Sequence, residues 1–185
     1  MKIICKKSNL QEAVFISQKA ITGKSSMPIL NGLKITAVNN KLTLIGSDID
    51  LSIETKIDSN VEEEGTVVID ARLFGEIIRK LPGEDVSIST VENNSLEILC
   101  QKSKFNLIHM NAEDFPEVPN INENMIFSMP QKILKNMIKS VIFATAQDET
   151  RPVLTGVLFE IKDKNLNLVA LDGYRLALKS EYLKH

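Results

Sequence analysis

The sequence predicts an α+β fold in which antiparallel sheets are built from repeated βαβββ units. One phrase occurs twice without a gap, as SMPILNGLKITAVNNKLTLIGSDID from Ser26 and as TRPVLTGVLFEIKDKNLNLVALDGY from Thr150, 124 positions later. Apolar residues at helical spacing are followed by runs that alternate like half-buried strands. Paired asparagines, Asn39-Asn40 and Asn93-Asn94, predict turns between such runs.

The repeat keeps its register over the whole phrase, which predicts an internal structural repeat. The matched pairs are Pro28 and Pro152, Leu30 and Leu154, Gly32 and Gly156, Leu42 and Leu166, Leu44 and Leu168, and Asp48 and Asp172. We expect a complete first domain at residues 1–124 and the first half of a second domain at residues 125–185. Because His185 aligns with Val61, inside the first unit, we expect the chain to be a fragment.

The first half of the first unit begins with a short strand, Lys2–Cys5, and an amphipathic helix, Asn9–Ile21. Ser8 or Asn9 is expected to cap this helix. Alternating apolar residues predict three further strands, at Leu30–Val38, Lys41–Ser47 and Leu51–Ile57. Leu51, Ile53 and Ile57 are expected to share one face of the last strand.

The second half of the unit repeats this order after an acidic turn at Glu62–Gly65. It begins with a strand at Thr66–Ile69 and a helix at Arg72–Leu81, which Pro82-Gly83 ends. The three strands that follow are expected at Val86–Val91, Leu96–Cys100 and Phe105–Met110.

The second unit opens with a predicted helix, Gln131–Phe143. Its expected core side comprises Ile133, Leu134, Met137, Ile138, Val141 and Ile142.

An acidic, proline-containing segment, Asn111–Asn124, separates the two units. It contains four acidic residues and no basic one, with prolines at Pro116 and Pro119. This composition is typical of an extended interdomain connector. Within it, Phe115 is expected to pack its ring onto the surface of a domain.

The composition limits the classes of function. With 43% hydrophobic and 25% charged residues and a net charge of −2, nucleic-acid binding would require a local basic surface. Cys5 and Cys100 lie in apolar runs, which predicts reduced core cysteines instead of a disulfide or a metal site. The apolar run in the first residues, MKIICKK, is too short for a signal peptide. No later apolar run is long enough to span a membrane. We expect a cytoplasmic protein that does not contact a membrane.

An enzymatic reading would rest on the carboxylates Asp48, Asp50 and Asp172, since paired aspartates can bind magnesium. However, Asp48 and Asp172 are repeat equivalents that each follow a strand, and side-chain capping of a turn explains both. His109 is expected to be a half-buried strand residue. No nucleophile motif or glycine-rich phosphate loop occurs, so we expect no catalysis, no cofactor and no metal. A metal-dependent nuclease using Asp48 and Asp50 is kept as the alternative.

Basic residues form stripes on two predicted helices. Lys132, Lys135 and Lys139 fall at i, i+3 and i+7 on the side away from the predicted core. Arg72 and Arg79 have the same seven-residue spacing, and Lys80 lies beside them. Such stripes are often only solvated faces. In an otherwise acidic chain, they also fit a surface that binds phosphates regardless of base sequence.

Several phrases together resemble the sliding clamp family, the beta subunit of bacterial DNA polymerase III. These are MKI at the start, GKSSMPIL, the DFP of the connector, RPVLTGVLFEI and LDGYRLA, in this order along the whole chain. The resemblance implies a DNA-clamp fold of three domains, each a βαβββ unit repeated, with strands outside and helices lining a ring. This chain would supply the first domain and half of the second, and would lack the third.

The resemblance also implies a function in replication. Clamps are non-catalytic accessory subunits that encircle double-stranded DNA without sequence preference. The full-length chain would form a head-to-tail homodimer. The replicative polymerase and the clamp loader would bind through short hydrophobic peptides. A small, open nucleic-acid-binding module is the second alternative to this reading.

Family positions and basic helix faces together define the expected sites. Expected DNA contacts are Lys24, Arg72, Arg79, Lys132, Lys135, Lys139, Gln147, Asp148 and Arg151. The expected cleft for partner peptides comprises Leu154, Leu171, Gly173, Tyr174, Arg175 and Leu176. Pro152 and Val153 stand where relatives often have polar or aromatic DNA contacts. Leu171 replaces a common threonine and Tyr174 a common histidine, so the cleft rim is expected to be more apolar.

Overall fold

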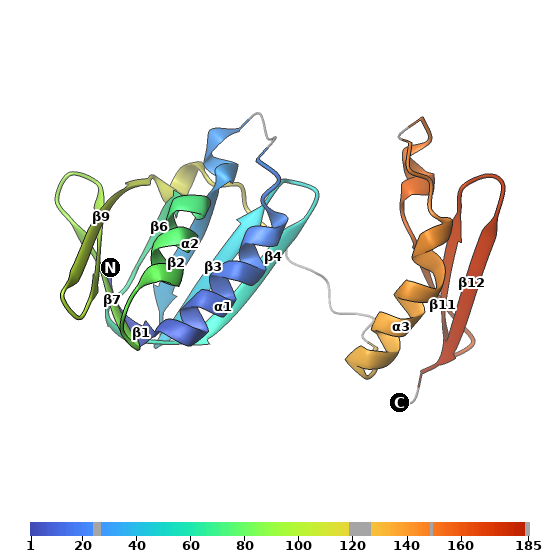
Figure 1. Cartoon of the computed structure of the whole chain (residues 1–185), viewed down its shortest axis with the longest axis horizontal. Helices are drawn as coiled ribbons and strands as arrows, with labels where there is room; N and C mark the ends of the chain where they lie inside the picture. The colour runs from blue at the N-terminus through green and yellow to red at the C-terminus, as the bar shows by residue number, and fades with distance from the viewer. Residues whose placement is uncertain (24–26, 119–126, 149, 184–185) are drawn as a thin grey trace. The chain divides into compact units, whose positions relative to one another are not determined.

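The computed structural model describes residues 1–23, 27–118, 127–148 and 150–183. The chain divides into two compact units, Met1–Pro119 and Asn120–His185, and each is described by itself (Figure 1). The expected domain boundary after residue 124 lies outside the described residues, as does Pro119 of the connector. Among the described helices, none is long and apolar enough to cross a membrane.

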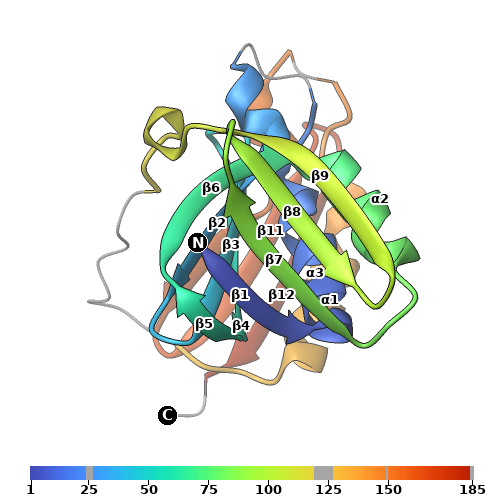
Figure 2. The ribbon, with the colours of Figure 1, turned by 90° about the vertical axis from the view of Figure 1, so that its left-hand side faces the viewer.

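Unit 1 contains the βαβββ order twice. The first copy comprises β1 (Lys2–Lys6), α1 (Lys7–Ser17), β2 (Gly32–Val38), β3 (Lys41–Ser47) and β4 (Ser52–Asp58). The second comprises β6 (Gly65–Asp70), α2 (Ala71–Lys80), β7 (Asp85–Val91), β8 (Ser95–Cys100) and β9 (Ser103–Met110). With β5 (Asn60–Glu63), these strands form an antiparallel sheet in the order β4-β3-β2-β6-β9-β8-β7-β1-β5. Figure 2 shows β9, β8, β7 and β1 side by side.

The main core lies between the helices and one face of this sheet. In Figure 1, α1 and α2 lie next to each other over the strands. Leu10 and Val14 of α1 and Phe74 and Ile78 of α2 are buried there. The alternate strand residues that meet them are Leu33, Ile35, Leu42, Leu44, Val67, Ile69, Val86, Ile88, Leu96 and Ile98.

Both cysteines are buried and free, which confirms the prediction for Cys5 and Cys100. Burial, with a smaller contribution from the carboxylate of Asp85, raises the pKa of the Cys5 thiol to about 12.

Two predictions about local structure in unit 1 are wrong. The acidic turn expected at Glu62–Gly65 is in part strand β5, in which Val61 pairs with Ile3 of β1. Lys2 Nζ lies 2.7 Å from Glu62 Oε2, and an edge strand tolerates such exposed charges. Leu51 lies outside β4 and is half exposed, so it does not share a strand face with Ile53.

The start of α1 also differs from the prediction. The helix begins at Lys7, and neither Ser8 nor Asn9 caps it. Instead, the Lys7 backbone N–H donates to Glu84 O at 2.6 Å, which satisfies one of the helix's free donors. The chain leaves α1 through a 3₁₀ turn, η1 (Gln18–Ala20), and the predicted strand at Leu30 begins with another 3₁₀ turn, η2 (Pro28–Asn31).

From its helix onward, unit 2 has the same elements as the first half of unit 1 at almost the same spacing. The described residues 127–130, which correspond to part of β1, form no strand. Its elements are α3 (Gln131–Val141), η4 (Ile142–Ala144), η5 (Pro152–Thr155), β10 (Leu158–Lys162), β11 (Asn165–Leu171) and β12 (Leu176–Tyr182). Apart from the start of β10, every boundary lies 124 positions after its counterpart in α1, η1, η2, β2, β3 or β4. The internal repeat predicted from the sequence is therefore present in the structure.

The core of unit 2 lies between α3 and the sheet β10-β11-β12. Met137 and Val141 of α3 pack against Leu166 and Leu168 of β11. The expected apolar side of the helix is narrower than the sequence suggested. Ile133 is 37% and Ile142 53% exposed, so including them in the core is wrong.

A separate apolar cluster lies on the opposite face of the unit 1 sheet, away from the helices. Phe115 is only 3% exposed and packs with Leu30 and Val68, and Ile45 and Met110 border this cluster. A 3₁₀ turn, η3 (Ala112–Asp114), positions the ring, because the Phe115 N–H donates to Ala112 O at 3.2 Å. The prediction that Phe115 packs onto a domain surface is confirmed.

Phe115→Ala should destabilise unit 1 by about 3 kcal/mol, since a buried ring is replaced by a cavity. Urea unfolding followed by circular dichroism would measure this loss. Both tyrosines of the chain, Tyr174 and Tyr182, lie in unit 2, so the transition followed by tyrosine fluorescence should not move. Phe105→Ala is the control, because Phe105 is 39% exposed and its loss should cost under about 1 kcal/mol. Equal effects of the two substitutions would contradict the role of Phe115.

Candidate nucleic-acid interface and partner cleft

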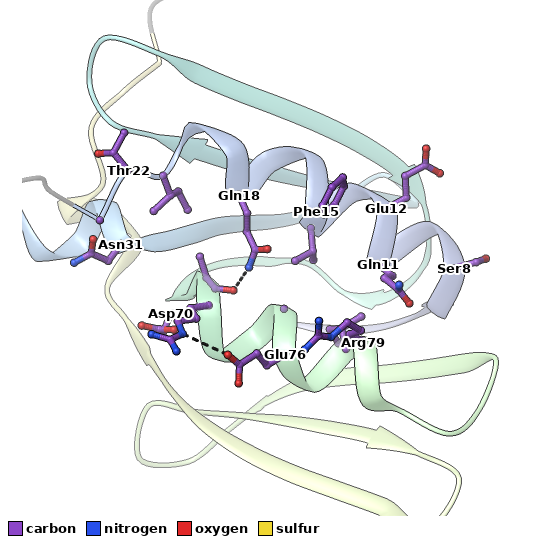
Figure 3. Close-up of a pocket in the computed structure, with 17 residues that line it drawn as sticks. Ser8, Gln11, Glu12, Phe15, Gln18, Thr22, Asn31, Asp70, Glu76 and Arg79 are labelled. Carbon is purple, nitrogen blue, oxygen red and sulfur yellow. Dashed lines mark hydrogen bonds and ion pairs between the residues drawn. The ribbon is translucent and has the colours of Figure 1, made fainter.

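A groove of about 950 Å³ runs between α1 and α2 on the side of the helices away from the sheet (Figure 3). The helices approach closely because α2 has a glycine at Gly75, where a Cβ would lie 2.4 Å from Gln18 Nε2. That amide donates instead to the Ala71 carbonyl. The groove is lined mainly by polar and charged side chains, among them Gln11, Glu12 and Arg79.

The charges of this groove are mixed. Arg72 is exposed, and its Nε lies 3.4 Å from Glu76 Oε1 on the next turn of α2. The Asp70 carboxylate accepts from the Leu73 N–H at 2.7 Å and so caps the helix. Among the described residues, Arg79 forms no ion pair. It is therefore the groove cation most available to an external anion.

Helix α3 carries a more uniform charge. Lys132, Lys135 and Lys139 are all exposed, and none is paired with a carboxylate in the part of the chain that the structure describes. By the 124-residue repeat they correspond to Ser8, Gln11 and Phe15 of α1, which line the groove of unit 1. The lysines therefore occupy the groove side of their helix, away from the core formed by Met137 and Val141.

The loop before η5 contains three further expected DNA contacts. Gln147, Asp148 and Arg151 are exposed. Asp148 accepts from the Thr150 hydroxyl and, at 3.0 Å, from the Thr150 N–H. These two hydrogen bonds lower the pKa of the Asp148 carboxyl, the one from the hydroxyl more strongly. Asp148 therefore shapes the loop, while its negative charge opposes phosphate binding. Lys24 lies outside the described residues.

The expected cleft residues come from three segments of unit 2. Leu154 is half-buried in η5, where its carbonyl accepts from the Ala146 N–H at 2.9 Å. Leu171 ends β11 and pairs with Leu176, which begins β12. These two leucines are 38% and 62% exposed, so they form an accessible apolar surface.

A tight turn connects the two leucines. The Asp172 carboxylate accepts from the N–H groups of Tyr174 and Arg175, each at 3.0 Å, and Arg175 Nε lies 2.7 Å from its other oxygen. Gly173 has φ +95°, a conformation that favours glycine. The turn leaves Tyr174 fully exposed.

Sequence reasoning missed one residue of this site. The Arg175 guanidinium lies 5.9 Å from the centre of the Phe143 ring, a cation–π distance. Phe143 is 59% exposed and comes from η4. Its place at the end of an apolar helical pattern made it look like part of the helix, and no sequence signal distinguished it.

Two of the three carboxylates of the enzymatic alternative, Asp48 and Asp172, cap turns. Asp48 Oδ1 accepts from the Leu51 N–H at 2.8 Å, the counterpart of the bond between Asp172 and Arg175. The prediction that both aspartates cap turns is confirmed. The described residues contain no group of three or more histidine, cysteine or acidic side chains placed to hold a metal ion.

Comparison with known proteins gives a consistent result. Residues 1–119 match the model of the DNA polymerase III beta subunit N-terminal domain, and residues 128–185 match that of its central domain. The beta sliding clamp of Halalkalibacterium halodurans is 41% identical over 169 residues, which cover 87% of this chain and 44% of that protein. The beta sliding clamp of Bacillus subtilis is 38% identical over 192 aligned positions, which cover 99% of this chain and 50% of that protein.

Solved structures agree with this match. The DNA polymerase sliding clamp from Bacillus subtilis superposes with a TM-score of 0.96 at 36% identity, covering all of this chain and 51% of that one. A DNA polymerase III beta subunit from Eubacterium rectale gives 0.95 at 39% identity, with the same coverage. The chain therefore spans about half the length of the relatives that it matches.

The Asp172 carboxyl should take up its proton at a lower pH than an ordinary aspartate, and the turn that it caps should change at that pH. Hydrogen bonds from the Arg175 N–H first, then from the Tyr174 N–H, lower the pKa of the Asp172 carboxyl, with smaller contributions from the Arg175 side chain. Because this pKa is lower in the folded state, the stabilisation is complete above the ordinary aspartate pKa and is lost as the pH falls through the lowered value. NMR titration of the Tyr174 and Arg175 amides should show a midpoint below that ordinary value. Asp172→Asn should abolish the titration, and a midpoint at or above the ordinary value would contradict the assignment.

Proposed function

We propose that this chain, which belongs to the DNA polymerase III beta subunit family, is part of a sliding clamp that encircles duplex DNA. In this role it raises the processivity of replication by tethering a replicative polymerase to its template. Residues 1–124 are the first domain and residues 125–185 the first half of the second. Since the chain spans about half of its relatives, the closed ring, its head-to-tail dimer and its partners all belong to the proposal.

The repeated helix side is the observation that best supports this role. In both units, one face of a helix is buried on the sheet, and the same set of positions faces away from it. At these positions α3 presents Lys132, Lys135 and Lys139. Lysines on one rigid face can contact phosphates, which fix position but carry no base-sequence information. Arg79 and Arg72 of α2, and Arg151 of the loop before η5, extend the proposed contact set.

A clamp needs no catalytic residues, and the hydrogen bonds of Asp48 and Asp172 fit that role. The nuclease alternative depends on Asp48 and Asp50 being available to a metal ion. Asp48 instead accepts a hydrogen bond within its turn, as its counterpart Asp172 does. We therefore propose a non-catalytic accessory subunit.

The proposed partner cleft takes a short peptide. Leu154, Leu171 and Leu176 provide an apolar floor, while Tyr174 and Arg175 provide a rim. An exposed aromatic ring and a guanidinium can bind an aromatic residue and a carboxylate, respectively. A peptide that ends in a Leu-Phe pair has the matching chemistry, and polymerases and the clamp loader are the proposed sources.

The DNA contact can be tested with labelled duplexes and fluorescence anisotropy. Binding by this chain should be weak, independent of base sequence, and weaker as salt is added. Lys135→Gln should reduce the slope of log affinity against log salt by roughly 0.9, the value for one phosphate contact. Lys162→Gln is the matched control, because Lys162 is an exposed lysine on β10 of the same unit. Selectivity for one base sequence, or an equal effect of the two substitutions, would contradict the proposal.

The cleft can be tested with a labelled peptide that ends in Leu-Phe. In a full-length clamp, Leu154→Ala and Tyr174→Ala should each weaken its binding by about 1–2 kcal/mol, as expected for anchor contacts. Binding by the 185-residue chain alone should be weak or absent. Fluorescence titration measures the loss. Tyr182→Ala is the control, since Tyr182 is an exposed tyrosine at the far end of β12. Undiminished binding by both cleft variants would show that the peptide docks elsewhere.

A further inference from the structure

The groove between α1 and α2 of unit 1 contains an exposed aromatic ring that the proposed duplex contacts do not use. Phe15 of α1 lines this groove and is 63% exposed (Figure 3). Its counterpart in unit 2, 124 positions later, is Lys139, one of the lysines proposed to contact phosphates. A lysine suits a phosphate, whereas an accessible aromatic ring suits a flat ligand that can stack on it. The two helices therefore present different chemistry from corresponding positions.

A cation lies beside this ring. Lys19 Nζ is 4.6 Å from the centre of the Phe15 ring, which is a cation–π distance. Because the ring is 63% exposed with the lysine in place, much of its surface remains accessible to a ligand. A nucleotide joins a flat base to a phosphate, so a ring with an ammonium group beside it matches both parts of this ligand.

The charges that line the groove leave one cation available. The ion pair and the helix cap described above engage three of the charged side chains, namely Asp70, Arg72 and Glu76. The other two are Arg79 and Glu12, and neither forms an ion pair within the described residues. Arg79 on α2 and Lys19 beside Phe15 thus provide cations from both sides of the groove. Glu12 is the carboxylate that opposes them.

The size of the groove and the position of the ring indicate which nucleic acid fits. A volume of about 950 Å³ lies at the upper end of the range of roughly 300–1,000 Å³ for ligand-binding clefts. In a duplex each base is stacked between its neighbours, and exposing one costs free energy. Only an unpaired nucleotide offers a free base to Phe15 without that cost. The ring is therefore better suited to single-stranded than to duplex DNA.

We propose that this groove binds unpaired nucleotides of single-stranded DNA, with one base stacked on Phe15 and the adjoining phosphates bound by Lys19 and Arg79. Aromatic rings combined with cations are how proteins bind single strands without sequence preference. The inference rests on the proposed role at DNA, and it goes beyond that role because the proposed duplex contacts include neither Phe15 nor Lys19.

The test compares two fluorescently labelled DNAs by anisotropy at low salt. One is a blunt duplex, and the other is the same duplex with a single-stranded overhang of about 10 thymidines, within the site sizes of single-strand binders. The parent chain should bind the overhang DNA more tightly. Phe15→Ala should reduce that affinity at least about fivefold, the lower end of the effect of losing one stacked base. It should leave the affinity for the blunt duplex unchanged.

Further substitutions of Phe15 separate stacking from the burial of apolar area. Phe15→Tyr retains a flat ring and should retain the preference for the overhang DNA. Phe15→Leu retains apolar area without a ring and should lose that preference. Phe15→Lys introduces the residue that unit 2 has at this position. It should also lose the preference, and it should steepen the salt dependence of blunt-duplex binding by roughly 0.9, the value for one phosphate contact.

Two other variants complete the set. Phe105→Ala is the matched control, because Phe105 is an exposed phenylalanine of unit 1 that does not line the groove. It should leave both affinities unchanged. Glu12→Gln removes the opposing carboxylate and should tighten binding of the overhang DNA. Because Phe15 and Glu12 are exposed, circular dichroism should show their variants folded like the parent chain.

Three outcomes would overturn this proposal and leave the duplex contact standing. The first is equal binding of the two DNAs by the parent chain. The second is an unchanged preference for the overhang DNA in Phe15→Ala. The third is an equal loss of both affinities in Phe15→Ala, which would make the ring a general duplex contact. Conversely, a preserved overhang preference together with no effect of Lys135→Gln on the blunt duplex would contradict the duplex contact alone.

Discussion

The alternation of side chains along antiparallel strands is the constraint on which the rest of the structure depends. Because successive residues point to opposite faces, each strand commits every second side chain to the helix-covered core. In unit 1 these are Leu33, Ile35, Leu42 and Leu44 and their equivalents. The residues between them remain free for other purposes, and so do the outward positions of the helices. The fold thus separates an interior geometry that the two units share from two surfaces that differ between them.

The two units show this separation directly. Their elements coincide after a shift of 124 positions, and even the backbone angles of the turns recur. Yet the groove side of the helix changes from Ser8, Gln11 and Phe15 to three lysines. On the face of the sheet away from the helices, charged and hydroxyl residues give way to leucines. The same scaffold therefore carries different side chains on corresponding faces of the two units.

Much of this architecture follows from the sequence because its signals are local. The asparagine pairs at residues 39–40 and 93–94 all have positive φ, so the turns are recognisable from residue type alone. The strand β5 was missed because glutamates disfavour strands in general, and only its pairing with β1 explains it. The early start of α1 depends on the carbonyl of Glu84, which is distant in sequence. The orientation of Arg175 over Phe143 likewise arises from contacts between separate segments, which periodicity does not encode.

The burial of both cysteines has a practical consequence for reactivity. A thiol reacts as its thiolate, and a pKa of about 12 leaves Cys5 almost wholly protonated at neutral pH. Cys100 is 2% exposed, so reagents have little access to its sulfur. Neither native thiol should therefore react readily with maleimides. A cysteine introduced at an exposed position, on α3 or on the face of a sheet away from the helices, would therefore react selectively with a spin label or dye. Spectroscopy could then follow that surface alone.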